Sequence, residues 1–330
     1  MKRTLLLIAL AFAVSAAFPL FIGGRDALLE LRTLPAPVWL TAMAAVGAGW
    51  IINAVRLRLV LGGLGHKLSL LRAIGRVMAI EFATNTTPAG GGGALAYVYL
   101  VAQGGLSSSH AAAMYALDQA LDLTFFLAAL LVITPLLLAG PSEQHLGWQI
   151  GTLLVLLVGG CLLLWLMVRD YRRVLLWAGR VLHHLRISVA RRRQLARWIL
   201  RFRHGLGLLL SLARWRLALV YALCVCHWLI RYSILFWIVR GLGAQVPWSY
   251  LFLTQMLSFG AGQVTLLPGG SGGVELGFSA LLAPWLPAAT LAAALLAWRC
   301  ATYYWLLVAG AGPFVLLVGR RLWQAPVEKT

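Results

Sequence analysis

Long apolar runs separated by short polar connections dominate the sequence. Six of these runs reach the length of about 20 residues that a helix needs to cross a bilayer. They cover residues 5–22, 38–61, 110–139, 149–168, 217–239 and 288–318. The first run exceeds the usual length of a signal-peptide core and no clear cleavage site follows it, so we expect it to be retained. The pattern predicts an all-α polytopic membrane protein with six full transmembrane helices.

Two further apolar stretches are interrupted by glycine. The stretch 73–103 breaks at a Pro-Ala-Gly-Gly-Gly-Gly run that starts at Pro88, and the stretch 249–286 breaks at a Pro-Gly-Gly-Ser-Gly-Gly run that starts at Pro268. The apolar piece after each break would extend only about 15–18 Å as a helix, which is too short to cross. Each stretch therefore predicts a re-entrant pair of half-helices.

Composition and charge agree with a membrane protein. Apolar residues make up 61% of the chain and charged residues 11%, which excludes ordinary soluble domains. The excess of 28 basic over 9 acidic residues would suggest nucleic acid in a soluble chain. In a membrane protein, Lys and Arg instead mark the cytoplasmic side. Residues 169–216 carry 13 of the basic residues and one acid, and residues 56–76 and both termini are also basic. We expect these segments, including both termini, to be cytoplasmic in a bacterial inner membrane.

The predicted elements repeat. A span, a broken pair and a second span occupy 38–139, and the same series returns in 217–319. With the orientation above, the first pair enters the membrane from the cytoplasm and the second from outside. Inverted repeats with broken helices at matching places are typical of transporters, whose substrate site lies near the midplane. The remaining segments are 1–37 (first span and outer loop), 140–216 (connecting span and basic segment) and the tail 320–330.

The basic segment contains an amphipathic helix. Arg193, Arg197, Arg201 and His204 share one face, and Leu195, Trp198, Ile199 and Phe202 share another. Such a helix lies on a membrane surface, where anionic lipid attracts each basic residue by about 1 kcal/mol. Residues 172–204 are therefore expected to bind inner-leaflet anionic lipids, with a solvated linker as the alternative. Nucleic acid is not an expected partner, and self-association is left open.

Several charged residues lie inside the apolar stretches, where each would cost about 2.5–3.5 kcal/mol or more at the bilayer centre. Asp118 and Asp122 share one helix face, and a salt bridge to an arginine, a shared proton and a bound divalent cation are all left open. Arg231 and Arg299 fall near the midplane by helix rise. The four cysteines lack metal-ligand spacing. No metal site and no cofactor are expected.

The second break carries the strongest candidate site. Glu275 follows it in the first helical turn, where it either interacts with the helix dipole, accepts a proton or pairs with Arg299. Free amides at the break, together with Arg231 and Arg299, would hold an anionic headgroup. The glycines that would supply these amides are Gly269, Gly270, Gly272 and Gly273, following Pro268. The matching residues of the first break are Pro88, Gly90 and Gly91.

The motif around the second break resembles a known signature. Residues 266–275 (Leu-Leu-Pro-Gly-Gly-Ser-Gly-Gly-Val-Glu), followed by Ala297-Trp298-Arg299 and Tyr303-Tyr304-Trp305, resemble the lysylphosphatidylglycerol synthase membrane-region family, also called flippase-like domain proteins. The resemblance covers about residues 5–320. It implies that Glu275 and Arg299 correspond to the characteristic Glu and Arg of that family.

The first motif departs from the same family. Residues 87–94 lack the family's Glu, and Asp118-Gln119 stands where the family has Glu-Arg, although Asp122 keeps the family's Asp. The synthases also carry a soluble aminoacyl-transfer domain after the membrane region. The chain ends at Thr330, so aminoacyl transfer is not expected.

These observations favour an inner-membrane lipid transporter or flippase. It would move an anionic phospholipid or a polyprenyl-type lipid between leaflets, with the headgroup in a polar groove at the midplane. Both glycine runs lack the Lys-Ser/Thr ending of a nucleotide-binding loop. Two alternatives remain. One is an integral membrane enzyme on lipid phosphates that uses Asp118, Asp122 and Glu275 as acid/base or metal groups. The other is a non-transporting scaffold for envelope-lipid synthesis.

Overall fold

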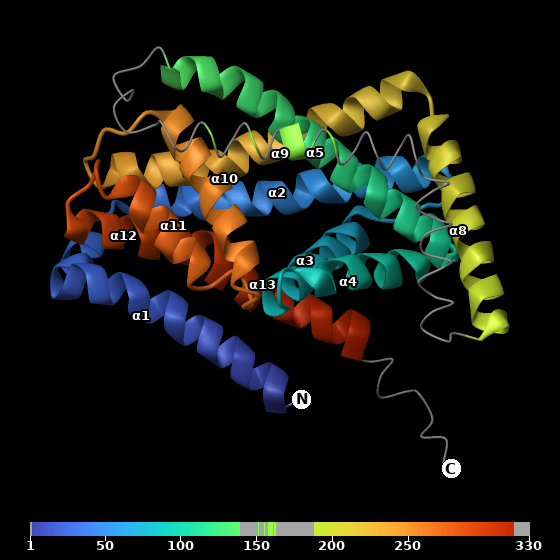
Figure 1. The fold of residues 1–330 in the computed structure, drawn as a ribbon, viewed down its shortest axis with the longest axis horizontal. Coiled ribbons are helices and arrows are strands. Elements are labelled where there is room, and N and C mark those ends of the chain that lie inside the picture. Colours follow the sequence, from blue (N-terminus) through green and yellow to red (C-terminus); the bar gives the residue numbers. More distant parts are fainter. Residues whose placement is uncertain are drawn as a thin grey trace. The chain divides into compact units, whose positions relative to one another are not determined.

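The computed structural model describes residues 2–138 and 188–319, together with residues 151, 155, 158–160 and 162. Within these ranges every regular element is a helix (Figure 1). Five helices there are long and apolar enough to cross a membrane: Ala11–Thr33, Ala36–Gly63, Ser108–Leu136, Arg214–Gly241 and Ala288–Gly319. The chain is thus an all-α, multi-pass membrane protein, and five predicted spans correspond to these helices. The sixth, 149–168, lies largely outside the described residues.

The first helix is longer than the sequence pattern suggested. Helix α1 runs from Lys2 to Thr33 with a kink at Gly24, whose φ of 55° and ψ of −145° are not helical. Helix α2 (Ala36–Gly63) begins directly after Pro35. Most of 23–37, which we expected as an outer loop, is therefore helical. Its Ala-Leu-Leu-Glu-Leu-Arg sequence is rich in strong helix formers, and their preference outweighs the charges that suggested a loop.

Two series of helices repeat each other in length. The first consists of α2, α3 (Leu70–Thr86), α4 (Gly91–Ala102) and α5 (Ser108–Leu138). The second consists of α9 (Arg214–Gly241), α10 (Trp248–Val264), α11 (Gly273–Leu282), and α12 (Ala288–Arg299) continued by η2 (Cys300–Tyr304), α13 (Trp305–Phe314) and η3 (Val315–Gly319). The lengths are 28 and 28, 17 and 17, 12 and 10, and 31 and 32 residues. Each series therefore has the long–broken–long order that the sequence predicts, while its direction through a membrane stays a prediction.

The described residues within 1–111 and 212–330 form one compact unit. In it α2 packs along α9, and α1 packs along α12 (Figure 1). Helix α3 contacts α2, α4 and α13, and α10 lies against α11. Small residues allow these close approaches: a Cβ at Gly23 would lie 2.6 Å from Ala292 Cβ, and one at Gly310 would lie 2.9 Å from the Met78 carbonyl oxygen. Such small residues are typical of helix contacts in membranes.

The described residues within 112–211 form a second unit. Its described part holds most of α5 and the helix α8 (Val189–Leu210). The predicted amphipathic helix is present, and the rings of Trp198 and Phe202 stack with centroids 5.8 Å apart on one side of it. The basic residues Arg193, Arg197, Arg201 and His204 are all exposed. The upstream part of the predicted lipid-binding segment, 172–187, and the tail 320–330 lie outside the described residues.

Candidate functional site

Both predicted helix breaks are present. Between α3 and α4, Ala89 and Gly90 adopt left-handed backbone angles, with φ of 48° and 69°. The Thr87 hydroxyl accepts a hydrogen bond from the Gly92 amide at 2.8 Å and so satisfies a donor in the first turn of α4. Between α10 and α11 the chain is non-helical from Thr265 to Gly272. Helix α4 starts at Gly91 and α11 at Gly273, so part of each glycine run lies in a first helical turn.

The two breaks meet. Pro88 and Pro268 form an isolated antiparallel β-bridge, although they belong to different helix series. Since proline has no backbone N–H, each can occupy only a non-donating position of such a bridge. Pro88 is exposed and Pro268 is buried. The sequence indicated two equivalent breaks but gave no sign that they touch.

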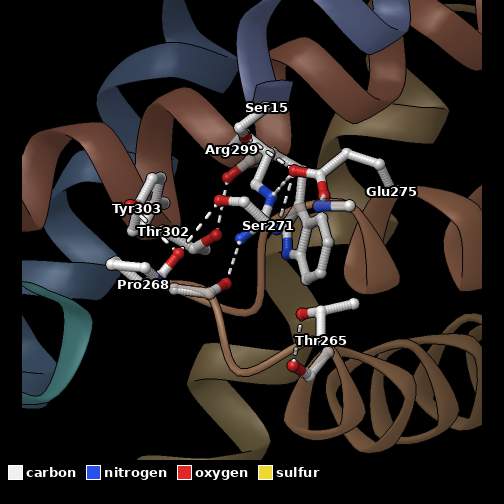
Figure 2. Close-up of polar contacts among 12 residues, drawn as sticks. Ser15, Thr265, Pro268, Ser271, Glu275, Arg299, Thr302 and Tyr303 are labelled. Atoms are coloured by element: carbon white, nitrogen blue, oxygen red, sulfur yellow. Dashed lines mark hydrogen bonds and ion pairs between the residues drawn. The ribbon is translucent and has the colours of Figure 1, made fainter. Parts of the chain in front are cut away.

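Glu275 and Arg299 form a buried ion pair beside the second break (Figure 2). Arg299 Nε donates to Glu275 Oε1 at 2.7 Å, and Nη1 donates to the Gly269 carbonyl oxygen at 3.1 Å. The exposed fraction is 0% for Glu275 and 1% for Arg299. The pair joins the first turn of α11 to the end of α12, and pairing was one of the roles that the sequence left open for Glu275.

The Glu275 carboxylate has partners on three sides. Its Oε2 accepts a hydrogen bond from the Gly272 amide at 2.7 Å, which satisfies one of the unpaired donors at the start of α11. Its Oε1 accepts a second bond, at 2.6 Å, from the hydroxyl of Ser15 on α1. Ser15 is fully buried. Sequence reasoning missed this residue, because a serine among alanines on an apolar helix is usually a packing residue.

One nitrogen of the Arg299 guanidinium, Nη2, makes no hydrogen bond within the described residues. Nη2 lies 2.7 Å from Glu275 Oε1 as an ion-pair contact. That contact lacks hydrogen-bond geometry, and Nη2 has no hydrogen-bond partner among the residues that the structure describes. The guanidinium carbon also lies 5.2 Å from the ring centroid of Tyr303 and 5.9 Å from that of Trp298, within cation–π range.

A π-helical turn, Cys300–Tyr304, follows Arg299 directly. One-residue bulges of this kind interrupt the helical register and are frequent at functional sites. The turn carries Tyr303, whose hydroxyl donates to the Pro268 carbonyl oxygen at 3.4 Å (Figure 2). Ser271 Oγ donates to the same carbonyl at 3.0 Å. The break is thus tied to the helix that carries the arginine.

The glycines of the second break have packing roles. Gly269 has a φ of 63°, and a Cβ there would run into the Tyr303 ring. A Cβ at Gly270 would lie 2.9 Å from Gly262 Cα, and one at Gly273 would run into the Ala261 carbonyl. The backbones of α10 and α11 therefore touch where a side chain would keep them apart.

Two of the four amides that the sequence offered to a headgroup already have partners in the chain. The Gly270 amide donates to the Leu267 carbonyl at 3.0 Å, and the Gly272 amide donates to Glu275. The carboxylate therefore occupies the place at the helix start where an external anion would bind.

The other predicted site residues are more dispersed. Gly90 and Gly91 lie at the first break with Pro88. Arg231 is half-buried on α9. Asp118 and Asp122 are half-buried one turn apart on the part of α5 that belongs to the second unit.

A second polar cluster, not singled out from the sequence, lies between α2, α3 and α9. Trp50 Nε1 donates to Glu81 Oε2 at 3.0 Å. On the next turn of α2, Arg56 Nη1 donates to Asn53 Oδ1 at 3.0 Å, and the Asn53 amide lies 3.4 Å from His227 Nε2. Arg56 and His227 are both buried. These contacts connect the first helices of the two series.

Comparison with known proteins agrees with this architecture. The family model described as lysylphosphatidylglycerol synthase TM region matches residues 8–310. A UPF0104 membrane protein from Archaeoglobus fulgidus is 24% identical over 263 residues, which are 77% of this chain and 79% of that protein. The family match runs through both helix series and includes the buried Glu275–Arg299 pair. The chain belongs to the lysylphosphatidylglycerol synthase transmembrane-region family.

Proposed function

We propose that this membrane protein moves a lipid with an anionic headgroup between the two leaflets of a bilayer. The observation that carries the proposal is the Glu275–Arg299 pair, which is fully buried beside a break in a membrane helix. The headgroup would pass the two breaks while the acyl chains stay in the bilayer. Phospholipids and polyprenyl phosphates both have the required anionic headgroup.

A buried ion pair is a poor way to stabilise a fold. The cost of removing two charges from water often exceeds their mutual attraction. Replacing such a pair with apolar residues of similar size often leaves the stability of a protein unchanged or raises it by about 1–4 kcal/mol. Charged residues inside membrane helices accordingly mark substrate or ion pathways. Glu275 and Arg299 fit this description, because one lies at a helix start and the other next to a π-turn.

The arrangement of the breaks supports a transport pathway. Two helix series of matching lengths, each broken at a corresponding proline, are the pattern of transporters built from inverted repeats. Non-helical backbone at membrane depth is tolerated where protein or a wet cavity covers it. Here the two breaks contact each other through the Pro88–Pro268 bridge. In the proposed orientation both termini and α8 lie on the cytoplasmic side of a bacterial inner membrane, and the basic face of α8 attracts anionic lipid.

The test is lipid translocation in proteoliposomes. Acyl-labelled fluorescent phosphatidylglycerol, phosphatidylcholine and a labelled polyprenyl phosphate are each reconstituted with the protein, and dithionite bleaches the label exposed outside. Protein that moves the lipid lets bleaching proceed beyond the outer half. We expect this for an anionic lipid, with a loss of at least about tenfold in rate for Glu275→Gln or Arg299→Lys.

The matched control is Glu81→Gln. Glu81 is another carboxylate on a broken helix, and a glutamine can still accept the hydrogen bond from Trp50. Its rate should stay close to that of the unmodified protein. Equal bleaching with and without protein for all three lipids would contradict the proposal.

A further inference from the structure

The Glu275 carboxylate is bound as a free anion would be. One of its oxygens accepts the amide of Gly272 at the start of α11, a helix of ten residues. The other accepts bonds from Arg299 Nε and from the Ser15 hydroxyl, at 2.7 and 2.6 Å. A helix N-terminus, a guanidinium and a hydroxyl are the donors that proteins use for phosphate.

The carboxylate does not satisfy every hydrogen-bond donor of this anion site. The Nε and Nη2 edge of a guanidinium offers two parallel donors that match two oxygens of one phosphate or carboxylate. In the structure both atoms lie 2.7 Å from the same oxygen, Glu275 Oε1. Only Nε makes a hydrogen bond there, and Nη2 is buried without a hydrogen-bond partner within the described ranges. A phosphate with two oxygens toward this edge would satisfy both.

The geometry points to Glu275 as an internal ligand. Its carboxylate occupies a phosphate-binding site of the protein and releases Arg299 when the phosphate of a lipid headgroup binds there. This inference rests on the proposed function and names the chemistry of its substrate, a phosphate ester attached to acyl or prenyl chains. Ser15 extends the site to α1, which lies outside both helix series. Its hydrogen bond makes it a positioning residue for the carboxylate.

The carboxylate and the phosphate must exchange, because they cannot share the site. Glu275 and Arg299 are 0% and 1% exposed, so bulk solvent does not screen a second negative charge beside the first. Two like charges next to each other in such a place repel strongly. The carboxylate therefore competes with the headgroup, and its removal should strengthen binding. A purely structural ion pair predicts the opposite, since removing either partner then disrupts the site.

The experiment measures binding of dioctanoyl phosphatidylglycerol to the purified full chain in dodecyl maltoside, a detergent without phosphate, by isothermal titration calorimetry. Dioctanoylglycerol, which lacks the phosphate, and sodium phosphate, which lacks the chains, are titrated in parallel. We expect Glu275→Gln to bind the phospholipid about tenfold tighter, because a competing charge is gone. Arg299→Lys keeps the charge but loses the fork, and should bind about tenfold weaker. Glu81→Gln should bind like the unmodified protein.

Ser15→Ala keeps the inference testable if Glu275→Gln does not fold. It removes one hydrogen bond to the carboxylate and should tighten binding about three- to fivefold. The inference is overturned if neither Glu275→Gln nor Ser15→Ala binds the phospholipid more tightly than the unmodified protein does. It is also overturned if Arg299→Lys binds the phospholipid as tightly as the unmodified protein. Sodium phosphate or dioctanoylglycerol that binds as tightly as the phospholipid overturns the assignment to a lipid phosphate.

Binding and transport are separable. Tighter binding by Glu275→Gln without any lipid movement in the proteoliposomes would support the phosphate site and reject the transporter. Lipid movement together with unchanged binding by Glu275→Gln would support the transporter and reject the exchange.

Discussion

Pro88 and Pro268 lie in the two helix breaks, each shortly before the glycines of its break, and they form an antiparallel β-bridge with each other. An antiparallel bridge between equivalent residues has a local two-fold axis. The first helices of the two series, α2 and α9, also pack along one another. Both contacts therefore join corresponding elements of the two series.

The two bridged residues are close enough to be joined by a disulfide. Bridged residues of antiparallel strands have Cα atoms about 4.5–5.5 Å apart, within the range of a disulfide. In a chain without its native cysteines, Pro88→Cys with Pro268→Cys should form a disulfide, visible as a mobility shift that reductant removes. If the breaks separate during lipid movement, oxidation stops transport in proteoliposomes and reductant restores it. Either cysteine alone is the control, and transport unaffected by oxidation would show that the breaks stay together.

The ion pair should be worth more to function than to stability. Replacing Arg299 alone with methionine leaves a buried carboxylate and should cost about 3–5 kcal/mol. Replacing both residues, Glu275→Met with Arg299→Met, should recover most of that loss, because no buried charge remains. Thermal unfolding in detergent measures the recovery and the proteoliposome assay measures transport. A double variant that is stable and inactive is the expected result, and one that is stable and active would make the pair structural.

Gly269 should not tolerate a side chain. Its φ of 63° disfavours other residues, and a Cβ would collide with the Tyr303 ring. We expect Gly269→Ala to lower the free energy of unfolding by about 1–3 kcal/mol. Gly260→Ala on α10 is the matched control, because a Cβ there meets nothing within 4 Å. Thermal unfolding should leave the control at least as stable as the unmodified protein, and equal losses in both variants would contradict the packing argument.

The proposed inverted arrangement predicts the sides on which two loops lie. The connection after α4 should face the cytoplasm and the connection after α11 should face outside. Ser107 and Ala283 are exposed residues of these connections. With single cysteines in their place, a membrane-impermeant maleimide should label position 283 in intact cells and position 107 only after the membrane is opened. Labelling of both from the same side would exclude the inversion.

Helix α8 should lie on an anionic membrane surface. An environment-sensitive fluorophore on a cysteine in place of Trp198 reports the apolar side, and the same label in place of His204 reports the basic side. We expect the Trp198 position to shift to shorter wavelength in nanodiscs of phosphatidylglycerol relative to phosphatidylcholine, because basic residues add about 1 kcal/mol each near anionic lipid. The His204 position should change less. Identical spectra in the two lipids would support the solvated-linker interpretation.

The sequence predicts most of the elements but few of the contacts between them. Apolar run length locates the spans, and proline with glycine locates both breaks within a few residues, because these signals act locally. The extension of α1 to Thr33 was missed because charged residues on a helix resemble those of a loop. The Pro88–Pro268 bridge and the Ser15–Glu275 bond join segments far apart in the chain, and nothing local in either partner signals them.

The close approach of α11 and the preceding break to α10 depends on glycines, whereas the candidate site depends on polar side chains. A side chain at Gly262, Gly270 or Gly273 would collide with neighbouring atoms, so these positions are fixed by steric contact. Ser15, Glu275 and Arg299 are instead held by hydrogen bonds and an ion pair, and they are the residues that the proposed transport would use. Substitutions at the three glycines should therefore act on stability, whereas conservative substitutions at the three polar residues should act on the proposed lipid movement.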